Sequence, residues 1–181
     1  MEKAGAQALR AGSIIRNLRD FVAKRDSERQ FATIDDVIHE SITLSVLGSA
    51  GGGVRITLDL TPHLEPVLID RVQIQQVLIN LICNAVEAMF ETVNRELHIS
   101  TRREEGGLRV TVCDSGQGMP PEVLASLFQP FVTTKEKGMG IGLTICKSII
   151  EAHGGRMFID SRPGTGICMG FTLPRETEVA P

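Results

Sequence analysis

The sequence is poor in aromatic residues: it contains no tryptophan, no tyrosine and seven phenylalanines. Only phenylalanine side chains could therefore stack on nucleobases. A net charge of −3 also argues against a large basic surface for nucleic acid. No apolar run reaches the roughly 18 residues of a membrane helix, and the first residues lack the apolar core of a signal peptide. These absences favour a globular protein that binds neither nucleic acid nor a membrane through this segment.

Cysteine is also scarce. The four cysteines are scattered within apolar segments, and none belongs to a CxxC pair: Cys83, Cys113, Cys146 and Cys168. Zinc binding is therefore not indicated. The pattern favours four buried, reduced thiols in a cytoplasmic protein.

The 181 residues are enough for one domain and an appendage. Apolar periodicity and cap signals predict helices over residues 4–25, 33–47, 70–90 and 141–153, with a short helix after Pro120-Pro121. Alternation predicts strands over residues 54–60, 96–101, 107–113, 156–161 and 166–173, and residues 129–140 read as a loop. Because most helices precede most strands, we expect an α+β fold in which helices cover one face of a mostly antiparallel sheet.

The predicted helix over residues 70–90 carries an unusual polar stripe. Gln73, Gln76, Asn80, Asn84 and Glu87 are spaced three or four residues apart, which places them on one face of the helix. A second face, directed at the core, holds Ile74, Leu78, Leu81, Ala85 and Ala88. The stripe either faces solvent or lines a ligand cleft in which amide oxygens are available to Mg²⁺.

Two glycine-rich runs suggest ligand contacts. In "VCDSGQGMP" (112–120), Asp114 follows a strand and can accept a hydrogen bond from an exocyclic amine, which would select adenine. In "KGMGIGL" (137–143), glycines precede an apolar helix, where backbone N–H groups form a phosphate cradle. Each run alone is weak evidence and favours a tight turn, and neither a dinucleotide fingerprint nor a P-loop is present.

The order of these segments resembles the catalytic ATP-binding domain of sensor histidine kinases, in the superfamily of DNA gyrase, Hsp90 and MutL. Residues 80–85 look like the N box of that family and residues 114–119 like its first glycine box. Phe128-Gln129-Pro130-Phe131 is similar to its F box, and residues 138–143 are similar to its second glycine box. "NAVEAM" and "LFQPFVTTKEKGMGIGL" look closest to the nitrogen-regulation and oxygen-sensing (FixL-like) branch.

The resemblance implies a two-layer α/β sandwich that binds ATP or ADP with Mg²⁺. Asn84 would hold the metal, Asp114 would bind the adenine amine, and Asn80 stands where gyrase-like relatives carry a catalytic glutamate. Lys135 would contact the γ-phosphate, although it is equally consistent with a solvated lysine. Further nucleotide contacts would come from Gly116, Gly118, Met119, Phe131, Thr133, Thr134, Gly138, Met139, Gly140, Ile141, Gly142 and Leu143.

Two positions depart from the family pattern. Glu87 stands where many of these kinases have a basic residue, so no phosphate contact is assigned to it. Ile167 replaces the usual threonine, so the hydroxyl contact to Asp114 should be missing and affinity for adenine should suffer.

The resemblance also implies partners outside this segment. Residues 1–30 would include the second helix of a dimerisation hairpin, and residues 31–181 would form the catalytic domain. His39-Glu40 is a poor match to the acceptor motif, and we expect His39 on a helix surface and His153 in a packing or capping role. The acceptor histidine should therefore lie outside this chain, which reads as a piece cut within the hairpin of a homodimeric kinase that serves a response regulator receiver domain.

Two other functions remain open from the residues. A degenerate nucleotide-binding scaffold would retain the boxes without phosphotransfer, and Glu87 and Ile167 leave room for it. An ATPase of the gyrase or chaperone type is disfavoured because the amide of Asn80 cannot serve as a general base.

Overall fold

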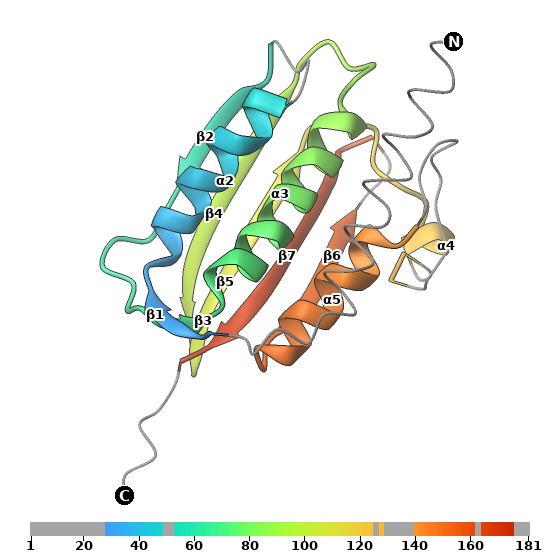
Figure 1. The fold of residues 1–181 in the computed structure, drawn as a ribbon. Helices are drawn as coiled ribbons and strands as arrows, with labels where there is room; N and C mark the ends of the chain where they lie inside the picture. Colours follow the sequence, from blue (N-terminus) through green and yellow to red (C-terminus); the bar gives the residue numbers. More distant parts are fainter. Residues whose placement is uncertain (1–27, 49–52, 125–126, 129–139, 162–163, 176–181) are drawn as a thin grey trace, which may run out of the picture.

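The computed structural model describes residues 28–48, 53–124, 127–128, 140–161 and 164–175. A five-stranded sheet is covered on one face by three helices, as expected for a two-layer α/β fold (Figure 1). The strands of this sheet are β2 (Arg55–Asp59), β4 (Glu96–Glu104), β5 (Gly107–Asp114), β6 (Arg156–Ser161) and β7 (Ile167–Pro174). The helices are α2 (Ile34–Gly48), α3 (Arg71–Ala88), α4 (Pro121–Leu124) and α5 (Gly142–Ala152), of which α2, α3 and α5 lie on the sheet.

The sheet has the order β2-β4-β5-β7-β6. Only β2 and β4 are parallel, and the other neighbours are antiparallel. Along β5, every second side chain is buried beneath the helices, ending with Val112 and Asp114. Because side chains alternate between the faces of a strand, Asp114 points to the helix-covered face and Cys113 to the open one.

Helix α3 lies across the middle of the sheet. Its N-cap, Asp70, accepts hydrogen bonds from the backbone N–H groups of Val72 and Gln73 at 3.0 and 3.1 Å. The predicted core-facing side chains Ile74, Leu78, Leu81 and Ala85 are buried. Ala88 was assigned to that face incorrectly: it is exposed, because the helix ends there and the following C-cap residue, Met89, turns into the core instead.

A second sheet of two short strands was not predicted. Strands β1 (Gln30–Ala32) and β3 (Val67–Ile69) pair antiparallel. Each has three residues, too few to show an alternating pattern. This small sheet leads directly into the N-cap of α3.

His153 joins the ends of two helices, which confirms its expected capping role. Its Nε2 accepts the backbone N–H of Asp70 at 3.0 Å, and Nδ1 lies 2.7 Å from the carbonyl oxygen of Ile149. Its side chain is buried, and burial lowers its pKa below the ordinary value of 6.5. His39 lies exposed on α2, also as expected.

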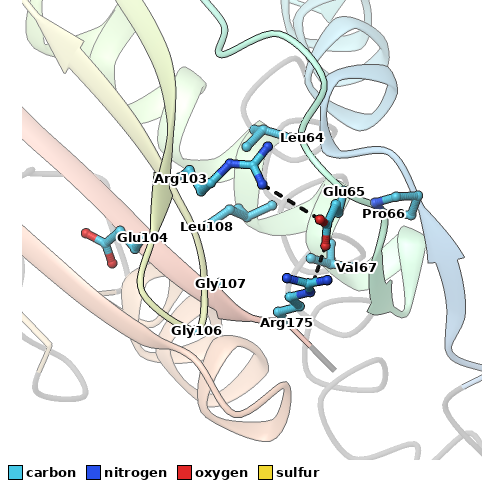
Figure 2. A pocket seen from close by; sticks show the side chains of 10 residues that line it. All are labelled: Leu64, Glu65, Pro66, Val67, Arg103, Glu104, Gly106, Gly107, Leu108 and Arg175. Atoms are coloured by element: carbon cyan, nitrogen blue, oxygen red, sulfur yellow. Dashed lines mark ion pairs between the residues drawn. The ribbon is translucent and has the colours of Figure 1, made fainter. Parts of the chain in front are cut away.

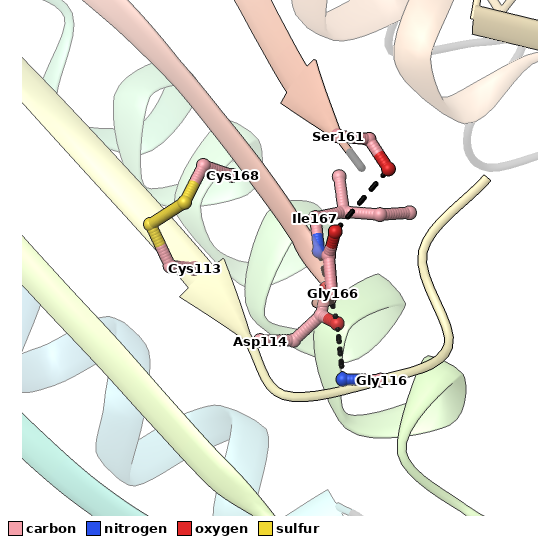
Figure 3. The surroundings of a disulfide bond; sticks show 7 residues. All are labelled: Cys113, Asp114, Gly116, Ser161, Gly166, Ile167 and Cys168. Atoms are coloured by element: carbon pink, nitrogen blue, oxygen red, sulfur yellow. Dashed lines mark hydrogen bonds between the residues drawn. A yellow bond between two sulfur atoms is a disulfide. The ribbon is translucent and has the colours of Figure 1, made fainter. Parts of the chain in front are cut away.

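The prediction of four reduced thiols is wrong for two of them. Cys113 and Cys168 form a disulfide between β5 and β7 (Figure 3), whereas Cys83 and Cys146 belong to no disulfide. The two residues are direct register partners, with Cα atoms 4.0 Å apart. They are separated by 55 residues in the chain, so only the strand pairing reveals the contact.

Candidate functional site

Asp114 is a buried carboxylate at the end of β5, with only 8% of the residue exposed. Its Oδ1 accepts the backbone N–H groups of Gly116 at 2.8 Å and Ile167 at 3.3 Å (Figure 3). Burial raises the pKa of this carboxyl above its ordinary value, and the two hydrogen bonds oppose that shift. Among the described residues none donates to Oδ2, which leaves this oxygen to accept a hydrogen bond from a ligand.

Two glycines allow the backbone to surround this carboxylate. A Cβ on Gly116 would lie 2.7 Å from Oδ1 of Asp114 and 2.9 Å from the carbonyl oxygen of Ala88. A Cβ on Gly166 would lie 1.9 Å from the carbonyl oxygen of Asp114, at a residue with a φ of +85°. No side chain fits at either position, so the chain needs glycine on both sides of Asp114.

The amide stripe of α3 lies against the start of α5. Asn80 donates through Nδ2 to Sγ of Cys146 at 3.1 Å. Burial raises the pKa of the Cys146 thiol to about 12, so it stays protonated. A Cβ on Gly142 would lie 2.9 Å from Oδ1 of Asn80, which explains the glycine at this crossing. Asn80 therefore belongs to a helix–helix contact and not to a freely solvated stripe.

The remaining stripe residues follow the same face. Asn84 lies one turn beyond Asn80 and is half-buried, as are Gln73 and Gln76, whereas Glu87 is exposed. Four of the five stripe residues are therefore partly shielded from solvent, which disfavours a fully solvent-facing stripe.

The first turn of α5 carries further polar groups. Its N-cap, Ile141, makes no side-chain capping bond. The first N–H groups of a helix have no partner within the helix and favour anions. The hydroxyl of Thr144 in that turn is buried without a hydrogen-bond partner among the described residues. The sequence patterns did not single out Thr144.

The structure brings the predicted site residues together in two places. Gly116 lies against Asp114 and the last residue of α3, Ala88, whereas Gly142 lies against Asn80 in the middle of α3. Asn84, Gly118, Met119, Gly140, Ile141 and Leu143 belong to the same segments. The predicted contacts Phe131, Thr133, Thr134, Lys135, Gly138 and Met139 lie outside the described residues. Sequence patterns also missed Ser161, whose Oγ accepts the N–H of Met119 at 2.9 Å.

A separate hollow of about 80 Å³ lies where β4 turns into β5 (Figure 2). There Glu65 pairs with Arg103 at 3.7 Å and with Arg175 at 2.7 Å. The hollow is smaller than ligand pockets, which usually measure roughly 300–1,000 Å³. It lies at the first residue of β5, Gly107, whereas Asp114 is the last residue of that strand. It is not the site described above.

Comparisons with known proteins show which family the chain belongs to. Sensor protein FixL of Bradyrhizobium diazoefficiens is 46% identical over 179 residues, which cover 98% of this chain and 35% of FixL. The C4-dicarboxylate transport sensor protein DctS of Rhodobacter capsulatus is 40% identical over 182 residues, covering 99% of this chain and 28% of DctS. The chain thus spans about a third of the length of these relatives.

Solved structures give the same result. The catalytic domain of histidine kinase ThkA has a TM-score of 0.72 and 34% identity, covering 82% of this chain and 96% of that domain. ThkA in complex with the response regulator protein TrrA has a TM-score of 0.79 and 28% identity, covering 97% of this chain and 50% of ThkA. Residues 69–177 match the family model described as "Histidine kinase-, DNA gyrase B-, and HSP90-like ATPase". The chain belongs to this ATPase family and carries its histidine-kinase type of domain.

Proposed function

We propose that this chain is the catalytic part of a two-component sensor histidine kinase. It binds ATP with Mg²⁺ and transfers the γ-phosphoryl group to a histidine outside the chain. The observation that carries the proposal is the buried carboxylate of Asp114, which accepts two backbone N–H groups beside the last residue of α3, the helix whose Asn80 contacts the start of α5.

The adenine amine is the proposed ligand of Asp114. Oδ1 already accepts two backbone N–H groups, so Oδ2 is the oxygen that would accept the exocyclic N–H of adenine. Guanine presents a carbonyl oxygen at the corresponding position, which a carboxylate repels. The site should therefore prefer adenine nucleotides.

The residues present suit a magnesium ion that is shared with phosphates. Within the described part of the chain, no group of three or more His, Cys, Asp or Glu residues could hold a metal ion. Magnesium usually takes few protein ligands and completes its shell with phosphates and water. The amide oxygen of Asn84 is the proposed protein ligand, and the ion would neutralise charge on the β- and γ-phosphates.

Asn80 supports phosphotransfer over hydrolysis. An amide cannot take a proton from water, and this one donates to Cys146, so it cannot serve as the carboxylate base expected of gyrase-like relatives.

Ile167, which replaces the usual threonine, still contacts Asp114, because the backbone N–H of Ile167 donates to the carboxylate.

The proposed partners are a dimerisation hairpin, a second copy of the full kinase and a response regulator receiver domain. The complex of the similar kinase ThkA with TrrA supports the last of these. No described helix is long and apolar enough to cross a membrane. A cytoplasmic location, the hairpin role of residues 1–30 and the lid contact of Lys135 stay predictions.

Phosphotransfer in trans tests the proposal. The chain is incubated with γ-labelled ATP and Mg²⁺, alone and with the hairpin of its own kinase. We expect acid-labile, base-stable label on the hairpin and none on the chain. Label on His39, or none on the hairpin despite ATP binding, would contradict the proposed reaction.

A further inference from the structure

Two backbone segments hold Asp114, and they are linked to each other. The first is the loop 115–119 after β5, which supplies the N–H of Gly116; the second is the start of β7, which supplies the N–H of Ile167. The N–H of Gly164 donates to the carbonyl oxygen of Gln117 at 2.7 Å, which ties the second segment to the first.

Ser161 makes the other link. Its Oγ accepts the N–H of Met119 at 2.9 Å and donates to the carbonyl oxygen of Gly166 at 3.2 Å (Figure 3). One hydroxyl thus serves as acceptor for the loop and as donor to the residue before Ile167.

The position of Ser161 in the sheet explains how it reaches both segments. It is the last residue of β6 and the register partner of Ile167 on β7. Register partners project to the same face of a sheet, so Ser161 lies on the helix-covered face together with Ile167 and Asp114. The side chain of Ile167 has no hydroxyl, and Ser161 supplies one from the neighbouring strand.

We propose that Ser161 is a positioning residue for adenine recognition. Its hydroxyl fixes the spacing between the loop 115–119 and β7, so that the N–H groups of Gly116 and Ile167 together orient the Asp114 carboxylate. This inference rests on the proposed nucleotide-binding function. Ser161 acts through backbone groups and does not itself contact the nucleotide.

Calorimetric titration with ADP and with GDP, both with Mg²⁺, tests the role. Ser161→Ala leaves the Met119 N–H without its partner and should weaken ADP binding by about 5- to 10-fold, with a smaller effect on GDP. Ser161→Thr keeps the hydroxyl and should retain ADP affinity. The matched control is Ser100→Ala, which removes the hydroxyl of a half-buried serine on β4 and should change neither affinity.

The outcomes separate this inference from the proposed function. A wild-type chain without preference for ADP over GDP would overturn the function itself. If the wild-type chain prefers ADP but Ser161→Ala binds ADP as tightly as wild type, only the proposed role of Ser161 is overturned. The same holds if Ser161→Ala loses equal affinity for ADP and for GDP. In an Asp114→Asn background, Ser161→Ala should bring no further loss of ADP affinity. If Ser161→Ala does not fold, Ser161→Cys, whose thiol is a weaker partner, carries the same test.

Discussion

At the scale of single residues, the site is built around a buried charge that does not stabilise the fold. Within the described residues no cation pairs with Asp114, and burial raises its pKa. Its protonated form is therefore favoured by folding. That contribution to stability is fully present below the unfolded pKa of about 3.8 and is lost as the pH rises through the folded pKa. At neutral pH the ionised carboxylate costs stability, which fits a group retained for binding.

Asp114→Asn should consequently leave the nucleotide-free chain at least as stable as wild type at neutral pH. The amide oxygen still accepts the N–H groups of Gly116 and Ile167, while the buried charge is gone. Thermal unfolding followed by circular dichroism at pH 7 should show an equal or higher Tm. A clearly lower Tm would mean that the carboxylate has a structural partner that this account lacks.

The glycine beside Asp114 gives a second prediction. Gly166→Ala should destabilise the chain more than Gly106→Ala, since the φ angles are alike, +85° and +81°, and only Gly166 has backbone within 4 Å of the added methyl group. Gly106→Ala should cost about 1–2 kcal/mol for the left-handed backbone. Gly166→Ala should cost about 1–3 kcal/mol more for the clash. Denaturant unfolding measures both, and equal losses would refute the close approach to Asp114.

Sequence alone singled out Asp114 and Gly116, because they stand in a short segment whose spacing carries the signal, and the structure places Gly116 against the buried Asp114. The metal role of Asn84 stays a prediction. Ser161 was missed because its bond to Met119 spans 42 residues and a lone serine at a strand end carries no pattern. Ile167 was expected to lack the hydroxyl contact to Asp114, and its contact is indeed made by a backbone N–H, which sequence patterns do not reveal. The expected loss of adenine affinity stays a prediction.

At the scale of elements, the long helices and strands were predictable and the short ones were not. The alternation over residues 107–113 predicted β5 to within one residue, because one face of that strand is buried along its length. Strands β1 and β3 pair with each other across about 35 residues of chain, so no local pattern predicts them. The pairing of Cys113 with Cys168 likewise follows from the register between β5 and β7 and from no local pattern.

The contact between α3 and α5 through His153 predicts a pH dependence. Its bond to Asp70 needs the neutral imidazole, because Nε2 accepts only when it carries no proton, whereas Nδ1–H can donate to the carbonyl oxygen of Ile149 in either form. Because its folded pKa lies below 6.5, this contribution is fully present above pH 6.5 and is lost as the pH falls towards the folded pKa. Between pH 7 and 5, the Tm of wild type should fall more steeply than that of His153→Gln. Parallel slopes would show that another group titrates.

The disulfide between β5 and β7 predicts how many cysteine thiols react with a thiol reagent. Of the four cysteines, Cys83 and Cys146 alone should react with a thiol reagent in denaturant before reduction, and all four after it. Cys168→Ser should show three reactive thiols without reduction. Four reactive thiols in the untreated wild-type chain, purified without reductant, would contradict the cross-link.

At the scale of the whole molecule, the order of the strands in the sheet decides which residues surround Asp114. The order of the sequence segments predicted a sheet with helices on one face, since early helices must cover strands that follow later. The sheet order β2-β4-β5-β7-β6 then puts β5 beside β7 and brings Asp114 next to Ile167, although 53 residues separate them. The start of α5 contacts the amide stripe at Asn80, and the loop after β5 contacts the last residue of the same helix, Ala88, through Gly116.

The central claim is that this end of the molecule selects adenine through Asp114. Calorimetric titration of the wild-type chain and Asp114→Asn with ADP and GDP, in the presence of Mg²⁺, tests it most directly. We predict that wild type prefers ADP and that Asp114→Asn weakens ADP binding by about ten- to a hundredfold, with loss of the preference. Wild-type affinity for ADP and an unchanged preference in a folded Asp114→Asn variant would contradict the account.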